Sequence, residues 1–156
     1  MINDVAQQVV RRLGEVNQTL CTAESCTGGQ IAVAITNVPG ASNIFLGGIV
    51  AYANTAKHNL LGVAEAVLAE HGAVSEPVAR QMALGARERF GADYAVSTTG
   101  IAGPGGGTDA KPVGLVCIAW ASPEGVKSVS VNLPGNREEI QAKAVLEALQ
   151  GILACI

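Results

Sequence analysis

The eight residues from Thr22 to Gly29 constrain the fold more than any other part of the chain, because T-A-E-S-C-T-G-G combines a hydroxyl side chain with two consecutive glycines. A β-compatible run, Thr19 to Thr22, leads into them, and small and β-branched residues follow from Thr27 to Thr36. This order predicts a strand, a tight turn and a helix. Such a turn holds Ser25 at the carboxyl edge of a sheet, beside free N–H groups at the helix start. The alternative is that Ser25 only caps the helix.

The composition favours one α/β domain spanning residues 1–156. A chain of 156 residues buries roughly two thirds of its unfolded surface, which is enough for a core without staples. The sequence is 49% hydrophobic but only 3% aromatic, with 19 glycines, so the core has to be closely packed from small aliphatic residues.

The charge and hydropathy patterns exclude some classes of partner. A net charge of -3 without a cluster of Lys or Arg argues against a nucleic-acid-binding surface. No apolar run reaches the ~20 residues of a membrane span, and the amino terminus is amphipathic and does not resemble a signal peptide. We therefore expect a cytoplasmic protein that binds neither nucleic acid nor membrane.

The four cysteines do not indicate a metal site. They form no C-x-x-C pair, no histidine stands at metal-ligand spacing, and buried thiols are the expected state of Cys21, Cys26, Cys117 and Cys155. Cys26 is an alternative nucleophile, but nothing around His58 or His71 suggests a Cys–His pair.

Hydrophobic periodicity and turn residues predict the order of the elements. Strands are expected at residues 19–23, 47–52, 94–99, 113–121 and 126–131, and helices at 4–17, 27–36, 54–62, 64–70, 75–90 and from 136 onward. We expect Asn54 to cap the third helix. The first strands form a parallel β-α-β unit, and the short connection 122–125 makes the last two strands an antiparallel hairpin.

Parallel strands bring the residues that follow them to one edge of the sheet, which is where open α/β sheets bind ligands. The first crossover places Lys57 beside Ser25. The same edge is expected to collect Tyr52, Asn54, Thr98, Thr99, the loop 101–107 (I-A-G-P-G-G-G), Asn136 and Arg137.

The available side chains restrict the chemistry at this edge. The sequence has no plausible metal cluster, no Ser, His and Asp series and no G-x-x-x-x-G-K-[ST] loop, which leaves Ser25 as a hydroxyl nucleophile and Lys57 as its base. A lysine pKa of ~10.4 must fall to about 7 or 8 for that role. The alternative is a solvated helix lysine.

Other groups can support this chemistry. The N–H groups of Thr27, Gly28 and Gly29 can hold an oxyanion, and Tyr52 or Thr99 can relay or orient the proton.

Arg137 occupies the first turn of the last predicted helix, where a cation opposes the helix dipole. This placement indicates a bound phosphate or carboxylate. A salt bridge to Glu138 or to a neighbouring chain explains it equally well.

Six motifs resemble one family along nearly the whole chain: A-E-S-C-T-G-G at 23–29, the stretch 39–57, G-A-V-S-E at 72–76, T-G-I-A-G-P-G-G-G-T at 99–108, K-P-V-G at 111–114 and P-G-N-R at 134–137. They resemble the CinA carboxyl-terminal domain family, whose stand-alone PncC-type members are nicotinamide-nucleotide amidohydrolases. The resemblance implies hydrolysis of nicotinamide mononucleotide to nicotinic acid mononucleotide and ammonia, in pyridine nucleotide recycling. It also implies a three-layer α/β/α sandwich that forms homo-oligomers and needs no metal or other cofactor.

Carried over by position, the resemblance makes Ser25 the nucleophile and Lys57 the base. Tyr52 and Thr99 become supporting groups, and Arg137 contacts the substrate phosphate. We expect further substrate contacts from neighbouring residues at this edge, namely Thr27, Gly28, Gly29, Asn54, Gly100, Gly103 and Gly105.

One motif departs from the family pattern, because the expected G-S-S is Gly40, Ala41, Ser42 here. Ser42 is thus a rival nucleophile. It precedes strand 47–52, at the opposite edge of the sheet and about 20 Å from Ser25 at ~3.3 Å per residue, so only a folded-back loop or a second subunit would bring it into the site. The alternative functions are a nucleotide-binding domain without turnover and a competence- or damage-associated interaction module.

Overall fold

A five-stranded sheet with the order β2-β1-β3-β4-β5 forms the centre of the computed structural model, which describes residues 1–156. The strands are β1 (Leu20–Glu24), β2 (Phe45–Val50), β3 (Tyr94–Gly100), β4 (Leu115–Ser122) and β5 (Gly125–Asn132). Strand β1 pairs in parallel with β2 and β3, whereas β4 runs antiparallel to both β3 and β5. The predicted mixed, mostly parallel sheet that ends in an antiparallel hairpin is confirmed.

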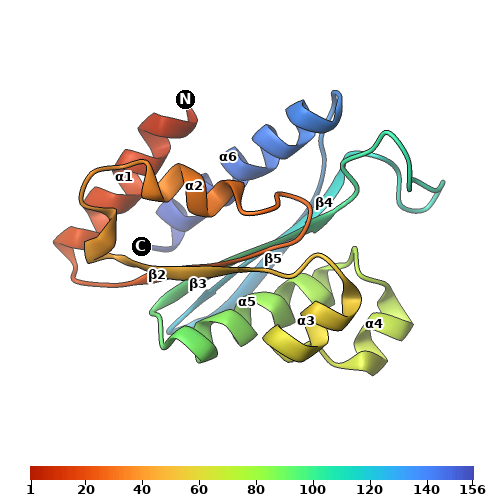
Figure 1. The fold of residues 1–156 in the computed structure, drawn as a ribbon, viewed down its shortest axis with the longest axis horizontal. Helices are drawn as coiled ribbons and strands as arrows, with labels where there is room; N and C mark the ends of the chain where they lie inside the picture. Colours follow the sequence, from red (N-terminus) through yellow and green to blue (C-terminus); the bar gives the residue numbers. More distant parts are fainter.

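Helices cover both faces of the sheet, which gives three layers (Figure 1). One layer holds α1 (Ile2–Glu15), α2 (Gln30–Thr36) and α6 (Arg137–Cys155), and the other holds α3 (Asn54–Leu61), α4 (Glu65–His71) and α5 (Glu76–Phe90). Each face has its own apolar cluster, of 23 and 15 buried residues. The three-layer α/β/α sandwich implied by the resemblance is therefore confirmed.

Local sequence signals explain where several helices begin and end. Ser75 accepts the N–H of Val78 and caps α5, which ends at Gly91 in a left-handed conformation. Helix α6 begins with a capping box in which Asn136 and Glu139 each accept the other's backbone N–H.

Some boundaries differ from the sequence-based expectation. The helix expected from Thr27 begins at Gln30, because Gly28 and Gly29 have φ values of 57° and 98°, which lie outside helical geometry. The expected cap residue Asn54 is instead the first residue of α3, and Ala53 occupies the cap position without a side-chain bond.

The hairpin of β4 and β5 determines at which edge of the sheet α6 begins. Because β4 runs against the first three strands and β5 runs with them, β5 ends at the same edge of the sheet as β1, β2 and β3. Helix α3 is fixed near this edge by its close approach to α5, where a Cβ on Gly85 would overlap the carbonyl of Leu61. The fold thereby gathers the segments after four strands.

Candidate active site

The turn after β1 is held by backbone hydrogen bonds on both sides of Ser25. The Ser25 N–H donates to the Thr98 carbonyl at 2.9 Å, and the Ser25 carbonyl accepts the Gly28 N–H at 3.1 Å. The expectation that Gly28 keeps a free N–H is therefore wrong, because the turn itself uses that group. The N–H groups of Thr27 and Gly29, the other two of the three predicted donors, have no acceptor in the chain.

Lys57 reaches Ser25 from the first turns of α3, as the crossover argument predicts. Its Nζ lies 3.1 Å from Ser25 Oγ and donates to the Tyr52 carbonyl at 2.9 Å. The lysine side chain is only 1% exposed. The expected proximity of these two groups is thus present within one chain, and the alternative of a solvated helix lysine is wrong.

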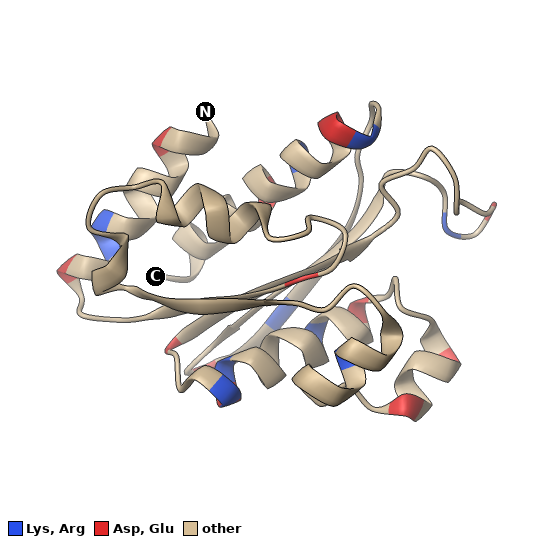
Figure 2. Ribbon diagram, in the orientation of Figure 1, with Lys and Arg blue, Asp and Glu red and all other residues tan.

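The surroundings of Lys57 favour its uncharged form. No carboxylate forms a salt bridge with Lys57. The sequence from Ser25 to Ala56 contains no charged residue, and α2 and β2 are therefore tan throughout in Figure 2. Burial lowers the pKa of Lys57 below its ordinary 10.5, and the Cys26 thiol opposes this shift. A lysine with a lowered pKa beside a hydroxyl can act as a general base.

A cavity of about 210 Å³ adjoins this pair of side chains. Its walls come from five parts of the chain, and they comprise Ser25, Cys26, Tyr52, Asn54, Lys57, Ala73, Val74, Thr99, Gly100, Ala102 and Arg137. The structure thus brings together seven predicted site residues, while Thr27, Gly28, Gly29, Gly103 and Gly105 are not part of this wall.

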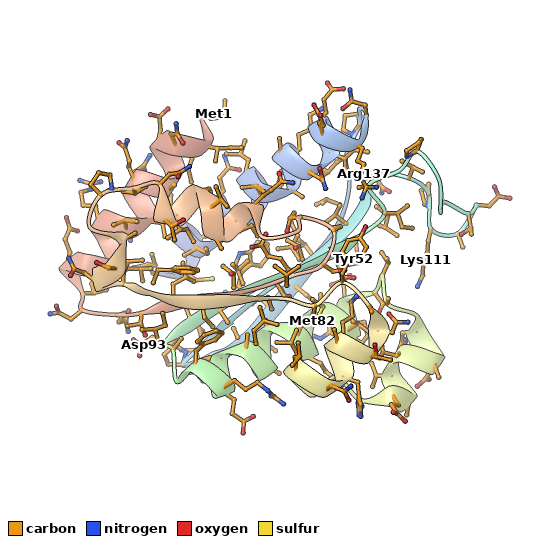
Figure 3. The ribbon with its side chains drawn as sticks, viewed as in Figure 1. Met1, Tyr52, Met82, Asp93, Lys111 and Arg137 are labelled. Atoms are coloured by element: carbon orange, nitrogen blue, oxygen red, sulfur yellow. The ribbon has the colours of Figure 1, made fainter.

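Tyr52 and Arg137 form the rim of the cavity, where Figure 3 shows them side by side. Arg137 donates from Nη1 to the Gly103 carbonyl at 2.7 Å and from Nη2 to the Tyr52 hydroxyl at 3.1 Å. It forms no salt bridge, so the alternative pairing with Glu138 is absent. Because Tyr52 is 62% exposed, this cationic rim faces solvent.

Two predicted threonines make contacts other than those expected. The Thr99 hydroxyl donates to the Ala73 carbonyl at 2.8 Å and bonds to neither Ser25 nor Lys57. The buried Thr27 hydroxyl donates to the Glu24 carboxylate at 2.6 Å. The Thr99 hydrogen bond therefore connects two segments of the cavity wall, the end of β3 and the segment before α5. Thr27 stabilises the turn through its bond to Glu24.

Cys26 also lines the cavity, but its surroundings oppose a nucleophilic role. Burial raises the pKa of this thiol to about 12, so it is almost entirely protonated near neutral pH. His58 contacts the Val63 carbonyl, and His71 contacts Glu70. Neither histidine contacts a cysteine, so Cys26 has no histidine base. No three His, Cys, Asp or Glu side chains gather as metal ligands.

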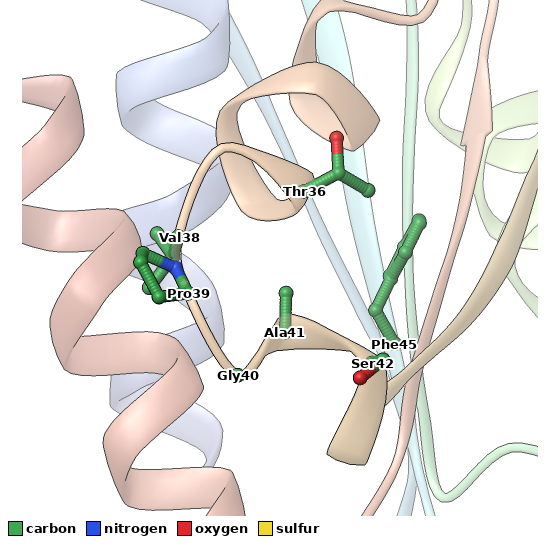
Figure 4. Close-up of a pocket in the computed structure, with 7 residues that line it drawn as sticks. All are labelled: Thr36, Val38, Pro39, Gly40, Ala41, Ser42 and Phe45. Atoms are coloured by element: carbon green, nitrogen blue, oxygen red, sulfur yellow. The ribbon is translucent and has the colours of Figure 1, made fainter.

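Ser42 lies at a separate place, in the short 3-10 helix Ala41–Asn43 before β2. Figure 4 shows the pocket of about 410 Å³ beside it, lined by Thr36, Val38, Pro39, Gly40, Ala41, Ser42 and Phe45. This lining contains no titratable side chain, so no base faces Ser42 there. Within one chain the pocket is at the amino end of β2, opposite the edge that holds Ser25.

Sequence reasoning missed two residues that hold the turn. Gln141 donates from Nε2 to the Cys26 carbonyl at 3.0 Å, and Glu24 accepts several hydrogen bonds although only 1% of it is exposed. The available signal for Glu24 was a carboxylate at the end of a buried strand, directly before a glycine turn that opens a helix. Glycines offer no side-chain cap, so another residue has to supply it.

Comparison with known proteins gives a consistent result over the whole chain. The model of the CinA C-terminal domain matches residues 2–156. The sequence is 57% identical over 121 residues to a CinA-like protein of Synechococcus sp. (strain CC9902), covering 78% of this chain and 29% of the relative. It is 51% identical over 150 residues to a CinA-like protein of Chlorobaculum tepidum, covering 93% of this chain and 36% of the relative. The chain thus spans about a third of the length of these curated relatives.

A solved structure extends the likeness to the fold. The competence/damage inducible protein CihA from Agrobacterium tumefaciens superimposes with a TM-score of 0.96 at 42% identity, covering 98% of this chain and 94% of that one.

None of the helices here combines the length and apolar character needed to cross a lipid bilayer.

Proposed function

This chain belongs to the CinA C-terminal domain family, and we propose that it is an amidohydrolase that converts nicotinamide mononucleotide to nicotinic acid mononucleotide and ammonia. The observation that carries the proposal is the 3.1 Å separation between Lys57 Nζ and Ser25 Oγ, with the lysine buried. This arrangement provides a nucleophile and a base without a metal or a cofactor.

In the first half of the reaction, Ser25 Oγ attacks the carboxamide carbon while Lys57 takes the hydroxyl proton. The carbonyl oxygen becomes negatively charged in the tetrahedral intermediate, and the N–H of Cys26, a residue of the cavity wall whose N–H has no acceptor in the chain, is a suitable donor to it. When the intermediate collapses, the C–N bond breaks and the protonated Lys57 gives its proton to the departing nitrogen. Ammonia leaves, and the acyl group stays on Ser25.

In the second half, water replaces the amine. Lys57, neutral again, removes a proton from a water molecule that attacks the acyl carbon, and then returns this proton to Ser25 Oγ as the ester bond breaks. The products are a free carboxylic acid and the regenerated serine. One lysine therefore serves as base and acid in both halves, and a depressed pKa suits it to both roles.

Arg137 is suited to the phosphate of the substrate. Its guanidinium makes hydrogen bonds only to the uncharged Gly103 carbonyl and Tyr52 hydroxyl, so its positive charge is not neutralised by a carboxylate. The cavity of about 210 Å³ is of a size to take the pyridine carboxamide, with the phosphate at the rim. Arginine binds phosphate through paired N–H donors.

Release of ammonia from nicotinamide mononucleotide tests the proposal directly. We expect turnover by the native chain and a loss of at least about 1000-fold in both Ser25→Ala and Lys57→Ala, with unchanged circular dichroism. Ser42→Ala is the matched control and should keep native activity. Tight binding of the nucleotide without ammonia release would favour the nucleotide-binding alternative, and full activity in Ser25→Ala would contradict the proposed nucleophile.

A further inference from the structure

A buried carboxylate lies directly before the candidate nucleophile and has no cationic partner. Glu24 is the last residue of β1. Its Oε1 accepts the Thr27 hydroxyl at 2.6 Å and the Ile31 N–H at 2.9 Å, and its Oε2 accepts the Ala32 N–H at 3.1 Å. A charge removed from water is tolerated only when hydrogen bonds replace its hydration. These three contacts therefore specify the position of the carboxylate.

Helix α2 depends on Glu24 for its cap. The cap position is Gly29, whose φ of +98° lies in the left-handed region that residues with a side chain rarely adopt. A side chain is disfavoured there, so the helix cannot be capped in the usual way. Glu24 satisfies two of its first N–H groups from the neighbouring strand instead, and its negative charge complements the positive end of the helix.

The same carboxylate orders a chain of hydroxyl groups beneath Ser25. Thr27 Oγ1 also lies 2.7 Å from Thr98 Oγ1. A carboxylate can only accept, so the single Thr27 proton goes to Glu24 and the Thr98 hydroxyl donates to Thr27. Because the Thr98 carbonyl accepts the Ser25 N–H, the network joins the turn to the neighbouring strands β1 and β3.

We propose that Glu24 is a positioning residue, which through Thr27 and Thr98 holds the Ser25 turn where Oγ meets Lys57 Nζ. This inference rests on the proposed amidohydrolase function, and it assigns Glu24 no contact with substrate. It also implies that the positive end of α2 is already occupied by Glu24, which leaves the turn and Arg137 to receive negative charge on the substrate.

Steady-state kinetics of four variants test the network. We expect Glu24→Gln and Thr27→Val each to lower kcat by about 100-fold, the effect of a small displacement of reacting groups, with KM within about threefold of native. Thr27→Ser keeps the hydroxyl and should restore kcat to within about threefold. Glu76→Gln is the control, since Glu76 also accepts hydroxyl donors, Ser128 and Ser130, at the start of a helix outside the site.

The pattern across these variants decides the outcome. Groups that act as one unit are not additive, so Glu24→Gln combined with Thr27→Val should be no slower than the slower single variant by more than about threefold. Native kcat in Glu24→Gln, or equal loss in Thr27→Ser and Thr27→Val, would overturn the proposal. If Glu24→Gln does not fold, the Thr27 pair still decides it.

A measurement without substrate separates this inference from the proposed function. In amide NMR spectra of Thr27→Val and Glu24→Gln, we expect the resonances of Cys26, Thr27 and Gly29 to shift and their hydrogen exchange to accelerate, with Thr27→Ser close to native. Native-like amides in all variants would overturn the positioning role. Absence of ammonia release by the native chain, with these amide changes present, would overturn the amidohydrolase function and leave Glu24 as the residue that holds the turn.

Discussion

Lys57 Nζ and Ser25 Oγ lie 3.1 Å apart, and the lysine is almost completely buried. A serine hydroxyl is a weak nucleophile until a base takes its proton. A lysine can be that base only when its surroundings disfavour the charged form. The contact and the burial therefore have to be considered together, and each can be tested separately.

The pH dependence of activity should report the state of Lys57. Because burial lowers its pKa below 10.5, we expect kcat/KM to fall as the pH drops through the lowered pKa, with a midpoint below 10.5. Lys57→Arg cannot lose its proton and should be inactive at every pH. If the native protein showed no loss of activity toward low pH between its lowest stable pH and pH 10, this role would be contradicted.

The same shift predicts a pH-dependent stability. Between the folded pKa of Lys57 and 10.5 the unfolded chain binds more protons, so the free energy of unfolding rises with pH across this window. Lys57→Met removes the titrating group and should lack this rise. Urea denaturation of both proteins at a series of pH values measures the difference, and parallel curves would show that Lys57 is not perturbed.

Arg137 should matter for phosphate more than for chemistry. We expect Arg137→Ala to raise KM for nicotinamide mononucleotide by about 10- to 100-fold, the effect of losing charge-assisted hydrogen bonds, with a small effect on kcat. The matched substrate is nicotinamide riboside, which lacks the phosphate and should show little change. Tyr52→Phe removes only the hydroxyl bond to Arg137 and should raise KM by less than about 10-fold, since Lys57 contacts the Tyr52 backbone. Equal losses on both substrates would argue against a phosphate-binding arginine.

Cys26 should be dispensable despite its place in the cavity wall. With the pKa of its thiol raised to about 12, we expect slow reaction with iodoacetamide in the folded protein, and Cys155, which is partly exposed, should react first. Mass spectrometry after a time course identifies the modified residue. Cys26→Ala should keep kcat within about threefold of native. A loss of kcat above 100-fold would support Cys26 as the nucleophile.

Two glycines in helices should respond in opposite directions to the same substitution. Gly85→Ala places a Cβ against the Leu61 carbonyl and should destabilise the protein by about 1–3 kcal/mol, as overpacking does. Gly14 has no neighbour within 4 Å of the added Cβ, so Gly14→Ala should stabilise the protein by up to about 1 kcal/mol. Urea midpoints measure both. Similar changes in the two variants would show that the approach of α3 to α5 is not tight.

The large-scale arrangement could be predicted from the sequence because it follows from general rules. Right-handed parallel crossovers and a short hairpin connection suffice to place Ser25, Lys57 and Arg137 at one edge of the sheet. Ser75 before α5 and Asn136 before α6 are residue types that favour helix starts, and both act as caps in the structure. These features depend on residue types and spacing, which the sequence displays directly.

Finer contacts could not be predicted, because they depend on single backbone angles and on which groups come within hydrogen-bond distance. The positive φ values of Gly28 and Gly29 delay the start of α2, and no periodicity reveals them. Nothing in the sequence indicates the acceptor of the Thr99 hydroxyl, which in the structure is the Ala73 carbonyl. The expected homo-oligomer and cytoplasmic location stay predictions.

The contact between Tyr52 and Arg137 joins the two flanks of the sheet, since one residue follows edge strand β2 and the other follows edge strand β5. Four strand spacings separate those edges, about 19 Å at ~4.8 Å each. Because this hydrogen bond connects residues from both flanks, the geometry of the cavity mouth depends on the twist of the entire sheet. Substitutions far out on either flank can therefore alter how a ligand enters without touching any residue of the cavity wall.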